Sequence, residues 1–278
     1  MPRLLAVFGH PDDESLFAGG VLAANAAAGS PTAVVTATWA EHTHRGAELA
    51  EALRLLGTPE KPRMLGYADS RVPGSAPGSP RLCDAPLDEA VGRLVAHLRE
   101  FRPDIVLTHD AYGGITGHED HVHTHRLTVL AVQAAGLERL YPEAGAPWRP
   151  RALYLATHPH SAVGVLGDFA EAGKGMRTVP DEWVTATVDV RPWLERKWAA
   201  VQAHRSEAER GAAPGLLAAL PREARETVLG TEWFIRQELM TGARTGETAL
   251  TAERGPGRLR TGQDGSESRR AFAVVAGS

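Results

Sequence analysis

The sequence contains one cysteine, Cys83, among 278 residues. A single cysteine cannot form an intramolecular disulfide, and it rules out zinc sites built from several thiolates. No apolar run reaches the roughly 20 residues that a membrane-spanning helix requires. The start, Met1-Pro2-Arg3, leads directly into an apolar run and lacks the pattern of a secretory signal peptide. We therefore expect a cytoplasmic protein without a membrane partner.

The sequence also lacks an excess of basic charge, because its 30 Lys and Arg face 34 Asp and Glu. The formal net charge of -4 gives no general attraction to nucleic acid or to anionic lipid. With 43% hydrophobic and 23% charged residues, the composition is that of an ordinary globular protein. A small molecule is therefore the expected partner, and nothing in the composition indicates an oligomeric state.

Short apolar runs alternate with helical patterns through the first half of the chain. Strands are predicted over 4–8, 33–38, 63–65 and 104–108. Helices are predicted over 15–28, 45–56, 87–101 and 122–135. This alternation predicts an α/β fold with a Rossmann-like, mainly parallel sheet flanked by helices. The Pro- and Gly-rich segment 70–86 is predicted to be a loop that lines or covers a pocket.

The C-terminal portion is less regular. Strands are predicted over 152–157 and 184–190, the second as an edge or antiparallel strand, and helices over 192–205 and 222–239. Residues 241–278 are poor in core side chains, which predicts a flexible tail, with 271–276 able to form a small strand. We expect a single α/β domain over 1–240 and a tail over 241–278.

The stretch GHPDDE, residues 9–14, lies between the first predicted strand and the first predicted helix. In open α/β sheets, ligands bind at this kind of strand-to-helix turn. His10 and Asp13 are close enough along the chain to share one metal ion, which leaves Asp12 free for another role. The alternative is that the acids only cap the helix, since helix N-termini favour acids.

A second cluster, GHEDHVHTH over 117–125, follows the strand predicted at 104–108. Clusters on two neighbouring strands would converge, and His and carboxylate ligands with an open position suit zinc or another first-row divalent ion. His123 and His125 alternate on a helix and cannot both face this site, so we expect them at the surface or in a supporting position. His109, at the end of a strand, is a further candidate for support.

Together the two motifs resemble the PIG-L/LmbE family of zinc-dependent N-deacetylases, which includes deacetylases of the mycothiol and bacillithiol pathways. The resemblance covers roughly residues 3–135 and extends weakly over 184–206. It implies that His10, Asp13 and His121 bind zinc.

The same resemblance implies the catalytic roles. Asp12 would be the base that takes a proton from the attacking water. His118 would stabilise the oxyanion or protonate the leaving amine, and Asp120 would orient His118.

The family resemblance also indicates a substrate site. The residues expected to bind substrate are Glu41, Arg45, Asp69, Lys197 and His204. A solvated helix face is the alternative for Arg45 and Lys197. A tyrosine that the mycothiol-pathway deacetylase carries two residues before the catalytic histidine is Thr116 here, which weakens assignment to that enzyme. Tyr112 is a candidate replacement.

We therefore expect a zinc-dependent hydrolase that removes an N-acyl group, above all N-acetyl, from a small sugar-like substrate of the N-acetylglucosamine type. Metal-activated attack by water fits the lack of a cysteine nucleophile motif and of GxSxG. One alternative is an amidase acting on a larger thiol conjugate or secondary-metabolite amide. The others are a Rossmann-type glycosyltransferase and a non-catalytic metal-binding module.

Overall fold

The computed structural model describes residues 1–164, 176–240, 250 and 253–254. An eight-stranded sheet in the order β3-β2-β1-β4-β5-β7-β6-β8 forms the centre of this part of the chain. Five strands are parallel: β3 (Arg63–Tyr67), β2 (Thr32–Thr38), β1 (Leu4–Phe8), β4 (Ile105–His109) and β5 (Ala152–Thr157). Three antiparallel strands follow: β7 (Thr231–Glu238), β6 (Ala186–Asp189) and β8 (Glu253–Arg254). The predicted α/β fold with a mainly parallel sheet is confirmed.

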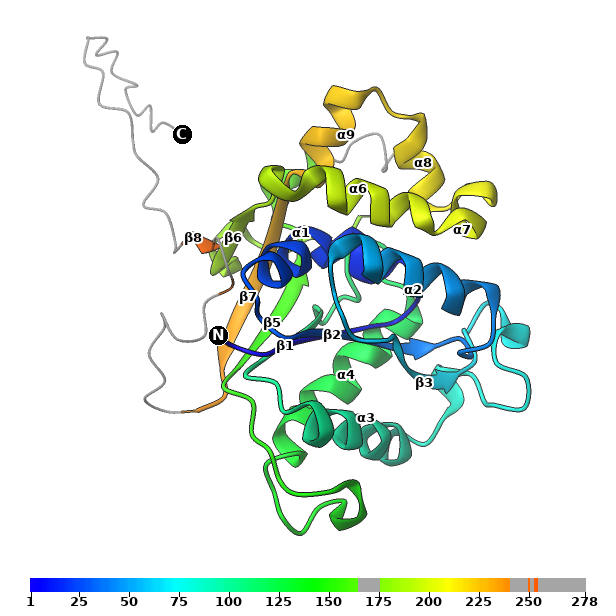
Figure 1. Cartoon of the computed structure of the whole chain (residues 1–278), viewed down its shortest axis with the longest axis vertical. Helices are drawn as coiled ribbons and strands as arrows, with labels where there is room; N and C mark the ends of the chain where they lie inside the picture. Colours follow the sequence, from blue (N-terminus) through cyan, green and yellow to red (C-terminus); the bar gives the residue numbers. More distant parts are fainter. Residues whose placement is uncertain (165–175, 241–249, 251–252, 255–278) are drawn as a thin grey trace, which may run out of the picture.

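Helices cover both faces of this sheet (Figure 1). One face carries α1 (Asp13–Ala27), α2 (His44–Leu56) and α6 (Leu194–Ala203), and the other carries α3 (Leu87–Phe101) and α4 (Glu119–Ala134). Every residue of β1, β2 and β4 is buried, as expected for parallel strands covered on both sides. Alternate side chains of β1 therefore enter two separate cores, with Leu4 and Phe8 in one and Leu5 and Val7 in the other.

Three short helices follow α6 and extend the first face: α7 (Arg205–Glu209), α8 (Ala213–Ala219) and α9 (Arg222–Leu229). Leu217 of α8 and Leu229 pack with Val201 of α6 in a third apolar cluster, which Leu16 of α1 joins. This packing holds α8 and α9 beside the start of α1. The 3-10 turns are Pro73–Ser75, Leu82–Asp84, Pro142–Ala144, His160–Gly164, Asp181–Trp183 and Arg191–Trp193.

The helix predicted over 222–239 is wrong in its second half. α9 ends at Leu229, Gly230 follows, and β7 begins at Thr231. Trp233, Phe234 and Ile235 favour a strand, and β7 pairs with β5 on one side and β6 on the other. Hydrogen bonds to two neighbouring strands outweigh the helical propensity of this segment. Of the two alternatives for the strand within 184–190, the antiparallel one is confirmed, and the edge one is wrong because β6 pairs with β7 on one side and β8 on the other.

Most of the predicted tail, including 271–276, lies outside the described residues. Of the residues in it that the structure does describe, Leu250 is 2% exposed and belongs to the first core, and β8 pairs with β6. The described helices include none with the length and apolarity needed to span a bilayer.

Candidate metal centre and active site

The two motifs meet at the carboxyl ends of β1 and β4, which are adjacent and parallel. β2 lies on the other side of β1, so the chain order reverses at this point of the sheet. Such switch points are where open α/β sheets bind ligands. His10, after β1, and His121, on α4 after β4, bring ring nitrogens within 3.0 Å of each other. The predicted convergence of the two clusters is therefore confirmed.

The turn after β1 is strained at Asp12, whose φ of 128° is rarely adopted by a residue with a side chain. The Asp12 carbonyl accepts the backbone N–H groups of Ser15 and Leu16, and its own N–H donates to Glu14 Oε2 at 3.0 Å. Asp12 makes no side-chain capping bond to α1. The capping alternative therefore fails for Asp12, and the turn instead aims its carboxylate into the site.

Three potential metal ligands, His10 Nδ1, Asp13 Oδ2 and His121 Nε2, lie close together. Their separations are 3.0 Å between the two nitrogens, 3.5 Å from His10 to Asp13 and 3.2 Å from His121 to Asp13. A tetrahedral zinc ion with bonds of about 2.0–2.1 Å separates its ligand atoms by roughly 3.3 Å. The donor set therefore fits a metal ion of this size and leaves one position open.

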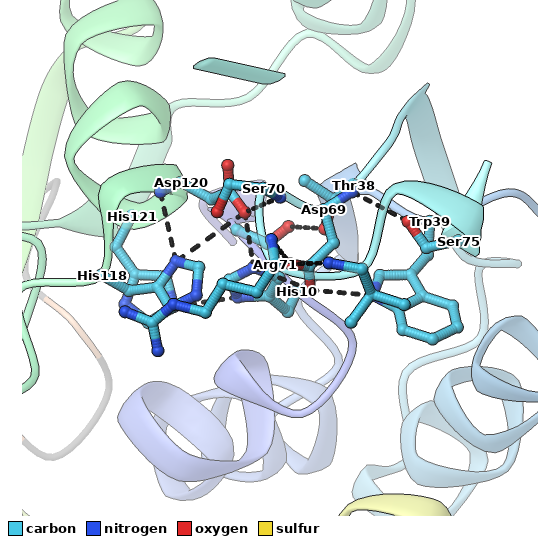
Figure 2. Close-up of polar contacts among 12 residues, drawn as sticks. His10, Thr38, Trp39, Asp69, Ser70, Arg71, Ser75, His118, Asp120 and His121 are labelled. Carbon is cyan, nitrogen blue, oxygen red and sulfur yellow. Dashed lines mark hydrogen bonds and ion pairs between the residues drawn. The ribbon is translucent and has the colours of Figure 1, made fainter. Parts of the chain in front are cut away.

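The outer nitrogens of both histidines are held by hydrogen bonds that turn their lone pairs inward. His121 Nδ1 donates to the carbonyl of Gly113 at 3.1 Å, and His10 Nε2 donates to Asp120 Oδ2 at 3.0 Å. Asp120 Oδ2 also accepts the N–H of Ser70 at 2.9 Å (Figure 2). Carboxylate and carbonyl acceptors behind histidine ligands are typical of metal sites, where they fix the tautomer.

Acidic groups around His10 favour positive charge at this position. Burial lowers the pKa of His10, but hydrogen bonds to Asp120 and Asp13 outweigh burial and raise it to about 10. Burial also opposes ionisation of Asp13, yet His121 holds the pKa of Asp13 well below its usual value. The geometry and the charges of the site therefore both suit a cation.

His109 supports the site by packing against His121 and Asp13. Its ring stacks on that of His121 with centroids 4.0 Å apart, and its Nε2 lies 3.4 Å from Asp13 Oδ2. This nitrogen accepts the Gly9 N–H at 3.1 Å, so its lone pair is already engaged. Burial lowers the pKa of His109 to about 3, which keeps the ring neutral. His125 supports His109 in turn, because its Nδ1 donates to the His109 carbonyl.

Asp120 contacts His118, as expected, but its carboxylate lies closer to His10. Its Oδ2 lies 3.0 Å from His10 Nε2 but 3.7 Å from His118 Nδ1. His118 Nδ1 instead accepts the backbone N–H of Asp120 at 3.2 Å as the N-cap of α4. The proton of His118 is therefore on Nε2, and burial together with the charge of His10 lowers its pKa to about 3. His118 thus lines the cavity as a neutral imidazole.

Arg45 is 1% exposed, so a solvated helix face is excluded for it. Its guanidinium lies 3.1 Å from Asp12 Oδ1 and 3.1 Å from Glu207 Oε1, and it also donates to the Pro11 carbonyl. Burial raises the pKa of Asp12 to about 6, although Arg45 acts in the opposite direction. Glu207 on α7 was not predicted, because only the tertiary structure brings it to Arg45.

A cavity of about 320 Å³ opens over these groups. Its polar lining comprises His10, Asp12, Asp13, Arg45, Asp69, Arg71, Thr116, His118, His121, His158, Glu207 and Arg210. Arg71 and Val72 confirm that the start of the 70–86 segment lines the pocket. Tyr112 is 45% exposed and is not part of the lining, so it does not replace the tyrosine of the mycothiol-pathway deacetylase.

Three predicted substrate-binding residues, Glu41, Lys197 and His204, do not line this cavity. Glu41 is exposed at the surface. His204 Nε2 pairs with Glu14 Oε1 at 2.8 Å, and both side chains are fully buried. Lys197 Nζ pairs with Glu232 Oε1 at 2.8 Å, also within the protein. The two buried pairs link α6 and the residue that follows it to α1 and β7, so they position elements rather than substrate.

The Lys197→Met variant should therefore lose stability. Removing Lys197 would leave the Glu232 carboxylate buried without its counter-ion, which costs about 3–5 kcal/mol of unfolding free energy. Chemical denaturation measures this loss, and the double variant Lys197→Met/Glu232→Gln should recover part of it. Unchanged stability together with a raised KM would instead restore the substrate-binding role.

The comparisons with known proteins agree with this geometry. Residues 5–132 match the sequence profile of PIG-L, described as GlcNAc-PI de-N-acetylase. A protein of Rhodococcus opacus, named 1D-myo-inositol 2-acetamido-2-deoxy-alpha-D-glucopyranoside deacetylase, is 35% identical over 267 residues, covering 84% of this chain and 90% of that protein. A Mycobacterium leprae protein of the same name is 40% identical over 255 residues, covering 74% of this chain and 80% of that protein.

The fold comparison points the same way. The crystal structure of a conserved protein from Thermus thermophilus matches with a TM-score of 0.59 at 27% sequence identity, covering 87% of this chain and 98% of that one. The similarity to the Rhodococcus protein extends well past the two motifs and over most of both chains. On these grounds the chain belongs to the PIG-L family.

Proposed function

We propose that this chain is a zinc-dependent hydrolase that removes the acetyl group from the nitrogen of an N-acetyl amino sugar. The observation that carries the proposal is the meeting in one cavity of three metal-ligand atoms, a buried carboxylate and a neutral imidazole. The relatives named above are deacetylases of an acetamido glucoside. Their names support the amide bond of an N-acetyl group as the bond that this chain cleaves.

His10, Asp13 and His121 would hold the metal ion. Two imidazoles and one carboxylate with an open fourth position form the donor set of a catalytic zinc site. When bound, zinc would polarise the amide carbonyl and lower the pKa of water toward about 7.

Asp12 is placed to accept the proton of the attacking water. Its Oδ1 is anchored to Arg45 and the side chain lines the cavity. With a pKa raised to about 6 by burial, Asp12 is ionised at neutral pH and more basic than an ordinary aspartate. After the carbon–oxygen bond forms, the same carboxyl can pass this proton to the nitrogen as the carbon–nitrogen bond breaks. The products are acetate and a free amine.

His118 is placed to stabilise the negative charge that develops on the carbonyl oxygen. Because its pKa lies near 3, the ring has no second proton to give at neutral pH, and its Nε2–H can act as a hydrogen-bond donor. Of the two roles expected for His118, the charge-stabilising one is therefore favoured.

The size of the cavity supports a small substrate. At about 320 Å³ it lies at the small end of ligand pockets, which range from about 300 to 1,000 Å³. A sugar fits this range better than a larger thiol conjugate. A glycosyltransferase has no need for two histidine ligands at one ion, and the relatives' names give it no support.

The proposal is tested by incubating the zinc-loaded protein with N-acetylglucosamine, its α-glycoside with inositol and N,N'-diacetylchitobiose. Primary amine and acetate should appear in equal amounts from at least one of them. Tight zinc binding without release from any N-acetyl sugar would contradict it. Cleavage of a larger amide would then favour the amidase alternative. Absence of any cleavage would favour a non-catalytic metal-binding module.

A further inference from the structure

Two arginine side chains have no acidic partner among the described residues: Arg71 lines the cavity near His118, and Arg177 lies against Gly117, the residue before His118. They belong to separate segments, one after β3 and the other before β6. Both side chains are exposed, so neither was placed there by the need to neutralise a buried acid. The position of both arginines beside residues 117 and 118 is what calls for an explanation.

Arg71 is fixed by the backbone of its own turn. Its N–H donates to Asp69 Oδ1 at 2.8 Å, and the preceding Ser70 N–H donates to Asp120 Oδ2 at 2.9 Å. The side chain lines the cavity and extends toward His118 (Figure 2). Its positive charge is one of the influences that lower the pKa of His118, after burial and the neighbouring histidines.

Arg177 is seated against the residue that precedes His118. A Cβ atom at Gly117 would lie 2.3 Å from Arg177 Nε and 2.5 Å from its Cζ, so the guanidinium occupies the space that glycine leaves free. The Arg177 N–H donates to the carbonyl of Ile115 at 2.9 Å. Its neighbour Met176 lines the cavity. A second guanidinium is thereby held against Gly117, one residue from His118, although Arg177 itself does not line the cavity.

The acids that line the cavity already have basic partners. Asp12 and Glu207 pair with Arg45, and Glu207 pairs also with Arg210. Asp13 and Asp69 face His10. Within the described part of the chain, Arg71 and Arg177 therefore have no acid to neutralise and can meet an anion from outside. A guanidinium binds carboxylate and phosphate groups through paired hydrogen bonds, which a neutral sugar cannot match.

We infer that the substrate carries a carboxylate or phosphate close to the N-acyl nitrogen, and that Arg71 and Arg177 bind this group. The inference rests on the proposed function, since it takes His118 to stand at the amide. An anion near the amide can be attached at C1 of the sugar, at O3, or to the acyl group itself. The substrate named for the relatives, an acetamido glucoside of inositol, has no anionic group. These arginines would thus give this chain a different specificity.

The test compares N-acetylglucosamine with three anionic forms: its 1-phosphate, its 3-O-carboxyethyl ether and N-succinylglucosamine. The 6-phosphate carries a remote anion and serves as the control substrate. At least one of the three should exceed the neutral sugar in kcat/KM by about tenfold or more, as charge-assisted hydrogen bonds allow, while the 6-phosphate should not. The form that is preferred identifies where the anion is attached. The preference should shrink as salt is added.

Arg71→Gln and Arg177→Gln should each lower the ratio of anionic to neutral kcat/KM by about tenfold. Arg139→Gln, at an exposed arginine outside the cavity, should leave the ratio unchanged. Equal turnover of neutral and anionic sugars, or an unchanged ratio in both variants, would overturn the inference.

Calorimetric binding of the amine products separates this inference from the proposed function. Glucosamine 1-phosphate or the 3-O-carboxyethyl ether of glucosamine should bind more tightly than glucosamine, and Arg71→Gln should remove the difference. This result would support the anion site even if no N-acetyl sugar were turned over, in which case only the proposed reaction fails. If charged and neutral products bound with equal affinity while N-acetyl sugars were turned over, the proposed reaction would be supported and the anion site would be refuted.

Discussion

Asp12→Asn should keep the metal ion and lose kcat by about 10²-fold or more, the loss expected when a general base is removed. Asparagine preserves the shape of the side chain and its hydrogen bond to Arg45 through the amide oxygen. It removes only the capacity to accept a proton. Metal analysis and steady-state kinetics on the same preparation measure both quantities. A variant that turns over substrate at the wild-type rate with metal bound would refute the proposed role of Asp12.

The pH profile gives a second measure of the same role. Asp12 must be ionised to act as a base, so activity should fall as the pH drops through its pKa. Burial raises that pKa to about 6 in the metal-free site, and the charge of a bound cation favours ionisation and shifts it downward. The acidic limb of kcat/KM should therefore lie at or below about pH 6. Loss of metal rather than of turnover in Asp12→Asn would exchange the roles of Asp12 and Asp13.

His10→Ala and His121→Ala should each lose metal binding almost entirely. Each removes one of three donor atoms that lie within 3.5 Å of one another. The fall in affinity should exceed the roughly 10–100-fold expected for Asp120→Asn, which removes only the carboxylate behind His10. Metal titration of the apo-protein gives the order of the effects.

His123→Ala is the matched control for these variants. His123 lies two residues from His121 on the same helix but does not line the cavity. Its metal content should equal that of the wild type. Near-full zinc in both His10→Ala and His121→Ala would remove the proposed centre, since each variant retains only two of the three proposed donors.

The first half of the fold and the place of the site could be predicted from the sequence because their causes are local. An apolar run followed by GHPDDE and an Ala-rich stretch specifies β1, a turn and α1 within 24 residues, Leu4 to Ala27. The second motif repeats this pattern after β4. In a parallel sheet, all such turns lie at the same edge, so two local patterns were sufficient to predict that His10 and His121 converge.

The remaining features depend on contacts between residues far apart in the chain. The segment 231–238 is a strand because β5 and β6 pair with it, and its own residues do not exclude a helix. Lys197 is buried because α6 approaches α1 at Gly19, where a Cβ atom would lie 3.0 Å from Lys197 Cγ. Its ion pair with Glu232 then satisfies a charge that a sequence pattern places at the surface.

The same holds for the polar partners within the site. Residue types and spacing identify which side chains can bind a metal ion or accept a proton, because these are properties of the groups themselves. Which group contacts which depends on how the turns, α4 and α7 pack. That packing brings the Asp120 carboxylate closer to His10 than to His118, and brings Glu207 to Arg45 across 162 positions of the sequence. The chemistry of the site was therefore determined by the sequence, whereas its network of positioning contacts was decided by the tertiary structure.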